Sequence, residues 1–225
     1  MKLQLNPLEI RVIGVLIEKE ITTPDQYPLS LNALTNGCNQ KSNREPVMDL
    51  SEAVVQETVD GLIKKHLVRS HSGFGSRVSK YQHRFFTAEF GELKLSPQEL
   101  AVMCELMLRG PQTPGELRSR AERMARLTDV EHVERILNDL MERGQPLVAR
   151  LPRQPGKREA RYAHCIGDEA FPIEEGMATE GSSSADQGGH DRIDALERTV
   201  AELQAQVATL QELVEMLIDS RPNGS

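Results

Sequence analysis

The sequence has no tryptophan, only three cysteines and no long apolar run, and each shortage excludes a class of protein. Aromatic residues make up 4% of the 225 residues, which favours helical layers of aliphatic side chains over a large β core. No stretch reaches the roughly 18 apolar residues needed to span a bilayer. The N-terminus also lacks the apolar core of a signal peptide, so we expect a cytoplasmic protein without a membrane partner.

Groups that carry catalysis or bind metals are missing as well. Cys38, Cys104 and Cys165 are far apart and odd in number, and no Cys-x-x-Cys pair exists. We therefore expect no disulfide framework, no metal site and no cofactor. The six histidines form no His-Glu-x-x-His motif, and neither a Gly-x-Ser-x-Gly motif nor a phosphate-binding loop is present. The sequence therefore predicts a protein that is not an enzyme.

The net charge of −7 comes from the C-terminal tail. Residues 165–225 hold 13 acidic and 3 basic residues, a net charge of −10, whereas residues 1–164 hold 24 basic and 21 acidic residues, a net charge of +3. The slightly basic N-terminal region therefore remains compatible with a nucleic-acid partner.

An internal repeat divides the N-terminal region into two copies. The segment Leu5–Glu9 reads Leu-Asn-Pro-Leu-Glu, and Leu95–Glu99 reads Leu-Ser-Pro-Gln-Glu, 90 residues later. Thr23-Pro24 returns as Thr113-Pro114 at the same offset. We therefore predict two copies of one module, at residues 1–90 and 93–167.

Each copy predicts three helices followed by a β-hairpin. Asn6 and Ser96 are suitable N-caps for the first helices, because each precedes a proline and has a glutamate three residues later. A short second helix is expected from about Leu29 to Cys38 in the first copy and from Thr113 in the second. Ser51 and Asp129 are expected to cap the third helices, and Leu62 and Leu140 are their equivalent core anchors.

Two short extended runs around a glycine-containing turn follow each third helix. Helix–helix–helix–hairpin is the order of a winged-helix domain, in which the hairpin is the wing. The predicted fold class is α+β, mainly α, with two tandem winged-helix domains. His71 and His83 are at positions that could face each other across the first hairpin, and we expect both to be exposed strand histidines without a metal-binding role.

The polar loop strings of the first copy carry a family resemblance. Residues 5–14, 18–19, 23–32 and 38–48, which include Thr-Pro-Asp-Gln-Tyr-Pro-Leu and Cys-Asn-Gln-Lys-Ser-Asn-Arg-Glu-Pro, resemble the YceH-like family of bacterial proteins. The resemblance covers about residues 3–167. It implies a tandem winged-helix fold and supplies no catalytic residues.

The tail predicts a linker and a coiled-coil helix. Residues 168–190 are rich in glycine, serine and acidic residues and resemble a flexible linker. Residues 191–219 show four heptads with apolar residues at every a and d position, which favours a parallel two-stranded coil and hence a homodimer. The alternative is that this helix folds back on its own domains. The predicted dimerisation residues are Ile193, Leu196, Val200, Leu203, Val207, Leu210, Val214 and Leu217.

Both hairpin regions are basic. Residues 64–84 contain no acidic residue, and residues 143–161 contain only Glu159. Lysine and arginine on a wing are suited to DNA phosphates, although charged hairpins also protect sheet edges from pairing. The predicted nucleic-acid-binding residues are Lys64, Lys65, Arg69, Arg77, Lys80, Arg84, Arg150, Arg153, Lys157, Arg158 and Arg161.

The loop before the first copy's third helix is a second candidate contact. Lys41, Asn43 and Arg44 have the side chains to meet a phosphate or a protein partner. The alternative is a local turn in which Asn and Ser hydrogen bonds hold the two flanking helices.

The third helices are acidic on their predicted exposed faces, which disfavours sequence reading in a major groove. We therefore expect a non-catalytic DNA-associated accessory or regulatory protein whose basic wings make largely sequence-tolerant phosphate contacts. The alternative is a protein–protein interaction scaffold, similar in architecture to segregation and condensation protein B.

Overall fold

A computed structural model of the chain describes residues 4–71, 78–85, 94–153, 156 and 159–167. Within these ranges the fold is α+β, with six α-helices, a short 3-10 helix and two small antiparallel sheets. The predicted linker at 168–190 and the predicted coiled-coil helix at 191–219 lie outside the described residues.

The first half contains three α-helices and a three-stranded sheet. The elements in chain order are α1 (Pro7–Thr22), η1 (Pro24–Gln26), β1 (Leu29–Ser30), α2 (Leu31–Cys38), α3 (Glu52–Lys64), β2 (Val68–His71) and β3 (Lys80–His83). The strand order is β1-β3-β2, so β3 is central and antiparallel to both neighbours.

The second half repeats the order of three helices and two strands. Its elements are α4 (Pro97–Arg109), α5 (Pro114–Ala121), α6 (Val130–Met141), β4 (Val148–Arg150) and β5 (Tyr162–His164). Strands β4 and β5 pair antiparallel, and an isolated bridge joins Gln112 to Tyr162.

Helix starts follow the predicted caps. Asn6 and Glu9 form a reciprocal capping box at α1, and Ser96 with Glu99 does the same at α4. The side chains of Ser51 and Asp129 accept the N3 backbone N–H groups of α3 and α6. These predictions are confirmed, because a capping residue needs only partners within its own first turn.

The second helix of the first half begins later than predicted, at Leu31 rather than Leu29. Leu29 and Ser30 form β1 instead, where they lie opposite Tyr81 and Lys80 of β3. The Ser30 hydroxyl also caps α2 by accepting the N–H of Ala33. These two residues pair with a strand about 50 residues away in the sequence, and α2 therefore begins only after them.

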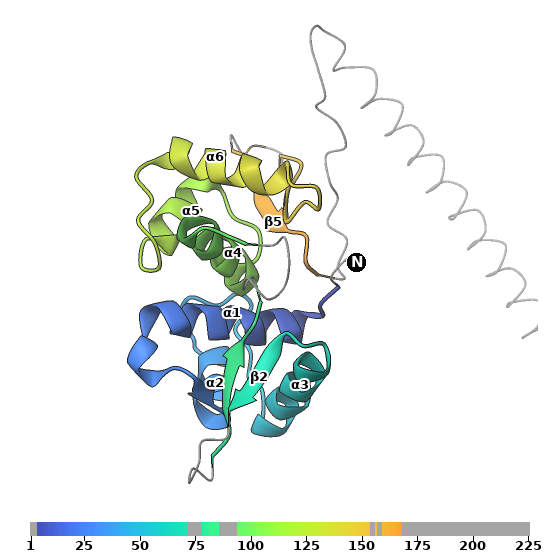
Figure 1. Cartoon of the computed structure of the whole chain (residues 1–225). Coiled ribbons are helices and arrows are strands. Elements are labelled where there is room, and N and C mark those ends of the chain that lie inside the picture. Colours follow the sequence, from blue (N-terminus) through green and yellow to red (C-terminus); the bar gives the residue numbers. More distant parts are fainter. Residues whose placement is uncertain (1–3, 72–77, 86–93, 154–155, 157–158, 168–225) are drawn as a thin grey trace, which may run out of the picture. The chain divides into compact units, whose positions relative to one another are not determined.

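Helix α1 is the centre of the core. Every residue from Glu9 to Glu18 is buried, because α1 packs against α2 and α3 on one side and α4 on the other (Figure 1). The approach to α4 is close, since a Cβ on Gly14 would lie 2.9 Å from Leu108 Cδ2. Cys104 Sγ also lies 3.4 Å from the Gly14 carbonyl oxygen. Glycine at this position lets the two halves share one core.

Candidate nucleic-acid interface

The first hairpin has one buried face and one exposed polar face. Because side chains alternate along a strand, cross-strand partners share a face. Tyr81 and His83 are buried, whereas the pairs Arg69–Gln82 and His71–Lys80 point the other way. Arg69, His71 and Lys80 are exposed, and His71 Nε2 lies 2.8 Å from Gln82 Oε1. We call Arg69, His71 and Lys80 the basic hairpin face.

The remaining basic residues predicted in this region differ in how available they are. Lys64 is exposed at the end of α3, and Arg84 is half-buried. Lys65 pairs with Glu9 at 2.7 Å, so its charge is already engaged near the start of α1. Arg77 lies outside the described residues. Arg69 and Lys80 have no charged partner in the described part of the chain, which leaves them available to phosphate.

Fewer basic residues of the second hairpin are free to meet a phosphate than its composition suggested. Arg161 donates to the Pro111 carbonyl oxygen at 2.6 Å and pairs with Glu116 at 3.3 Å. Arg150 is half-buried in β4, whereas Arg153 is exposed. Lys157 and Arg158 lie outside the described residues. Among the described basic residues of this hairpin, only Arg153 is both predicted to bind nucleic acid and exposed.

The polar loop before α3 is held from within. Arg44 is 5% exposed, donates to the Gly37 carbonyl oxygen and pairs with Glu18 at 2.5 Å. The predicted external contact by Arg44 is therefore wrong, because its guanidinium is enclosed by the protein. Asn43 adopts a left-handed backbone (φ 58°) and accepts a hydrogen bond from Arg109.

Further bonds support the alternative reading of this loop as a structural turn. The Asn39 side-chain amide bonds both the N–H and the carbonyl of Leu50 at 2.8 Å. Buried Arg11 donates to the carbonyl oxygens of Cys38 and Pro46. Lys41 alone of the three predicted loop residues is exposed. The loop thus braces α2 against α3 and offers one cation to solvent.

An ion-pair cluster with two buried carboxylates, Glu18 and Glu105, joins the two halves. Arg123, which follows α5, reaches Glu18 of α1 at 2.6 Å and Glu105 of α4 at 2.6 Å. Burial opposes ionisation of Glu18, but hydrogen bonds and charges from Arg44 and Arg123 outweigh it and lower the pKa of the carboxyl. We call Glu18, Arg44, Glu105 and Arg123 the interhalf cluster.

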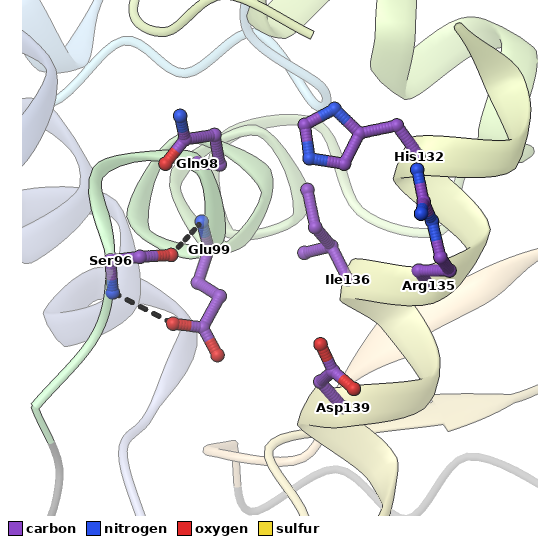
Figure 2. Close-up of a pocket in the computed structure, with 7 residues that line it drawn as sticks. All are labelled: Ser96, Gln98, Glu99, His132, Arg135, Ile136 and Asp139. Carbon is purple, nitrogen blue, oxygen red and sulfur yellow. Dashed lines mark hydrogen bonds between the residues drawn. The ribbon is translucent and has the colours of Figure 1, made fainter. Parts of the chain in front are cut away.

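The exposed sides of α3 and α6 are rich in acidic residues. Glu52, Glu57 and Asp60 are exposed on α3, and the exposed acidic residues of α6 are Glu131, Glu134 and Asp139. Beside α6 lies a polar groove of about 390 Å³ between that helix and the start of α4. Figure 2 shows His132, Arg135, Ile136 and Asp139 lining it from α6, opposite Ser96, Gln98 and Glu99.

These charges make the third helices poor partners for DNA. Carboxylates repel phosphates, and among base edges only the cytosine amino group readily rewards a carboxylate. The groove is also lined by charges of both signs, since Arg135 and Asp139 lie on α6 and Glu99 lies opposite on α4.

His71 and His83 do not face each other, and the expectation that both are exposed is wrong for His83. His71 lies opposite Lys80, and His83 lies opposite Val68. His83 is 4% exposed and points inward, because the alternation of β3 places it on the same face as buried Tyr81.

Comparison with known proteins gives the chain a family. A family model described as "Protein of unknown function, DUF480" matches residues 5–157. The chain belongs to the DUF480 family. The UPF0502 protein of Vibrio vulnificus strain CMCP6 is 56% identical over 221 residues, which cover 97% of this chain and all of the relative. The UPF0502 protein of Aeromonas hydrophila is 56% identical over 217 residues, which cover 96% of this chain and 99% of the relative. The UPF0502 protein of Hahella chejuensis is 54% identical over 213 residues, which cover 94% of this chain and 93% of the relative.

The resemblance to the YceH-like family agrees with this membership. The relatives of this DUF480 protein match nearly the whole chain, whereas the family model ends at residue 157. Membership in this family supplies no reaction and no ligand.

The described part of this DUF480 protein lacks both a membrane-spanning helix and a cluster of metal ligands. In the described ranges, no helix is long and apolar enough to cross a membrane. The same ranges contain no group of three or more metal-ligating side chains. The buried thiols are also poor nucleophiles, because burial raises the pKa of Cys38 to about 12 and that of Cys104 well above its ordinary value.

Sequence reasoning missed the interhalf cluster and the burial of Arg44. The sequence signal was the run of charged residues Glu18, Lys19 and Glu20, which directly follows the apolar stretch from Val12 to Ile17. A charged residue flanked by Ile17 and Ile21 suggests a buried charge, but its partners lie 26 and 105 residues away.

Proposed function

We propose that this protein is a non-catalytic, DNA-associated accessory or regulatory protein that contacts phosphates with the basic hairpin face. The observation that carries the proposal is the shared exposure of Arg69, His71 and Lys80 on one side of β2 and β3. Residues 64–84 contain no carboxylate to neutralise them. Such a function places the protein in the cytoplasm.

The order of elements supports a winged-helix interpretation of each half. Three helices precede two antiparallel strands in both halves, and the first half adds β1 to its sheet. In this interpretation β2 and β3 form the first wing. Wing residues meet the sugar–phosphate backbone, which positions a protein on a duplex without reading its sequence.

The charges of the third helices determine the expected specificity. Since Glu52, Glu57 and Asp60 disfavour entry of α3 into a major groove, binding is led by the hairpin. A few phosphate contacts give weak to moderate affinity, tolerance of sequence and a steep dependence on salt, because each neutralised phosphate releases counterions.

The test is fluorescence anisotropy of the full chain with random duplexes at several salt concentrations. The double variant Arg69→Glu, Lys80→Glu should weaken binding to all sequences alike and flatten the salt slope. The matched control is Arg135→Glu, an exposed arginine on acidic α6, which should leave binding unchanged. A chain ending at Gly167 lacks the acidic tail and should bind at least as well. Absence of binding by both chains at about 50 mM salt would rule out the proposal.

The exposed acidic residues of α3 and α6 favour a second candidate, a protein–protein interaction scaffold. A pull-down from lysate with and without nuclease separates the two. Partners that survive nuclease treatment and are lost in Glu131→Lys, Glu134→Lys would support the scaffold.

The proposal includes a homodimer formed by the C-terminal heptads. Its support is the unbroken a/d pattern from Ile193 to Leu217, which lies outside the described residues. Leu203→Asp with Leu210→Asp should give a monomer by light scattering while far-UV circular dichroism still reports a folded protein. A wild-type chain that is monomeric at tens of micromolar would contradict the dimer.

A further inference from the structure

His83 lies at the base of the first hairpin with an acceptor at each ring nitrogen. Its Nε2 is 2.6 Å from Glu20 Oε2 of α1, and its Nδ1 is 3.1 Å from the Phe85 carbonyl oxygen. The His83 backbone N–H donates to the Tyr27 hydroxyl at 2.9 Å. The side chain is 4% exposed, so water does not substitute for these partners.

This arrangement needs two protons, one between the ring and each of its two acceptors. A neutral imidazole has one N–H and one lone pair, whereas a carbonyl oxygen and a carboxylate only accept. Both distances are hydrogen-bond distances, so a neutral ring would leave one pair of acceptors in contact. The Glu20 side chain is 39% exposed and water solvates its charge, which favours the second proton on the ring rather than on the carboxylate.

Among the described contacts of His83, one side chain is charged. Glu20 contacts the ring from α1, and the ring of Tyr27, in the segment between η1 and β1, lies tilted to it with the ring centroids 6.4 Å apart. Its partner across the sheet on β2 is Val68, which is uncharged. Glu20 is therefore the one charged side chain among these contacts, and its attraction to the ring depends on the proton.

We propose that His83 and Glu20 form a proton-dependent clamp that positions the basic hairpin face on α1. When the ring is doubly protonated, the end of β3 is fixed to α1 and to Phe85. Loss of one proton breaks one of these bonds and loosens the central strand, which also carries Lys80. His83 and Glu20 act as positioning residues, and neither touches the nucleic acid. The effect on binding rests on the proposed function, whereas the clamp itself does not.

The first test measures the protons directly in the full chain. Nitrogen-15 NMR of the histidine side chains should show both His83 ring nitrogens protonated at about pH 6. His83→Gln identifies the signal. A ring with one unprotonated nitrogen at about pH 6 overturns the clamp.

The second test measures the stabilising effect of the clamp as a function of pH. Denaturation midpoints of wild type, His83→Gln and Glu20→Gln are compared at about pH 6 and pH 9. Both substitutions should lower the midpoint more at the lower pH, where the clamp is intact. His71 is an exposed histidine on the same hairpin, so His71→Gln should lower the midpoint only slightly and by the same amount at the two pH values. Equal losses at both pH values for all three variants would show that His83 has only a packing role.

The third test asks whether the clamp affects DNA. Glu20→Gln should weaken binding of random duplexes at about pH 6 at least twofold, with the salt slope unchanged because no phosphate contact is removed. Full affinity in this variant, while the wild type binds, overturns the positioning of the hairpin. If the wild type binds no duplex but the first two tests succeed, the proposed function fails and the clamp stands.

Discussion

Glu18 and Arg123 are 105 residues apart in the sequence and form a 2.6 Å ion pair between the two halves of the fold. The Glu18 side chain is 1% exposed and also receives Arg44 at 2.5 Å, while Arg123 continues to Glu105. Buried charges are tolerated only where each has a partner, because an unpaired one keeps its full desolvation cost. The cluster thus couples the two halves energetically.

Removing the charge of Glu18 tests this coupling. Glu18→Gln leaves Arg44 buried beside a neutral amide, which should cost roughly 3–5 kcal/mol of unfolding free energy. Chemical denaturation followed by circular dichroism measures it. The matched control is Glu57→Gln on the exposed side of α3, where a change within about 0.5 kcal/mol is expected. Similar values for the two variants would contradict the role of the interhalf cluster.

Local features of this fold could be predicted from the sequence, and long-range pairings could not. The capping boxes at Asn6 and Ser96 depend on residues three positions apart, so the sequence alone reveals them. The register of the first hairpin depends on how β2 meets β3, so the sequence alone did not show that His71 and His83 lie opposite other residues. Arg44 looked like a surface residue because its partner Glu18 is 26 residues away.

The same distinction applies to the candidate site. The basic composition of the hairpin was visible, and the exposure of Arg69 and Lys80 agrees with it. Composition could not show that Lys65 and Arg161 already have carboxylate partners in Glu9 and Glu116. The ion pairs in the folded protein show which of the predicted basic residues are already engaged and which are free to meet a phosphate.

His66 provides a test of the backbone at the end of α3. It has a left-handed conformation (φ 61°), its N–H donates to the Ile63 carbonyl oxygen, and the next N–H donates to Leu62. Glycine adopts this conformation without steric cost, so His66→Gly should stabilise the protein by about 0.5–1 kcal/mol. His66→Val should destabilise it by at least about 1 kcal/mol. A higher denaturation midpoint for His66→Val than for His66→Gly would contradict the left-handed backbone at this position.

Leu62 and Leu140 test the two cores. Both are fully buried late in the third helices, as predicted from the repeat. Truncation to alanine should cost roughly 2–5 kcal/mol at each site, because the lost contacts leave a cavity. Val54 of α3 is 36% exposed, so Val54→Ala is the control and should cost much less unfolding free energy. Thermal unfolding measures all three. A cost below about 0.5 kcal/mol at either leucine would mean that its helix packs differently.

His164 should make the protein sensitive to mild acid. It is 8% exposed in β5, and burial lowers its pKa to about 4. The unfolded chain takes up this proton near pH 6.5, whereas the folded chain does so only near pH 4. Stability contributed by the neutral ring is therefore complete above about pH 6.5 and falls as the pH decreases towards 4.

The measurement is the denaturation midpoint at intervals between about pH 7 and pH 4.5, above the range in which Glu18, with its lowered pKa, takes up a proton. Wild type should lose stability steadily across this range. His164→Gln cannot take up the proton, so its stability should change less, even if its value at pH 7 is lower. His71→Gln removes an exposed histidine and should keep the slope of the wild type. If His164 is buried and neutral, the midpoint of His164→Gln must depend less on pH than that of the wild type. An equal dependence on pH in the two proteins would mean that other groups cause the acid sensitivity.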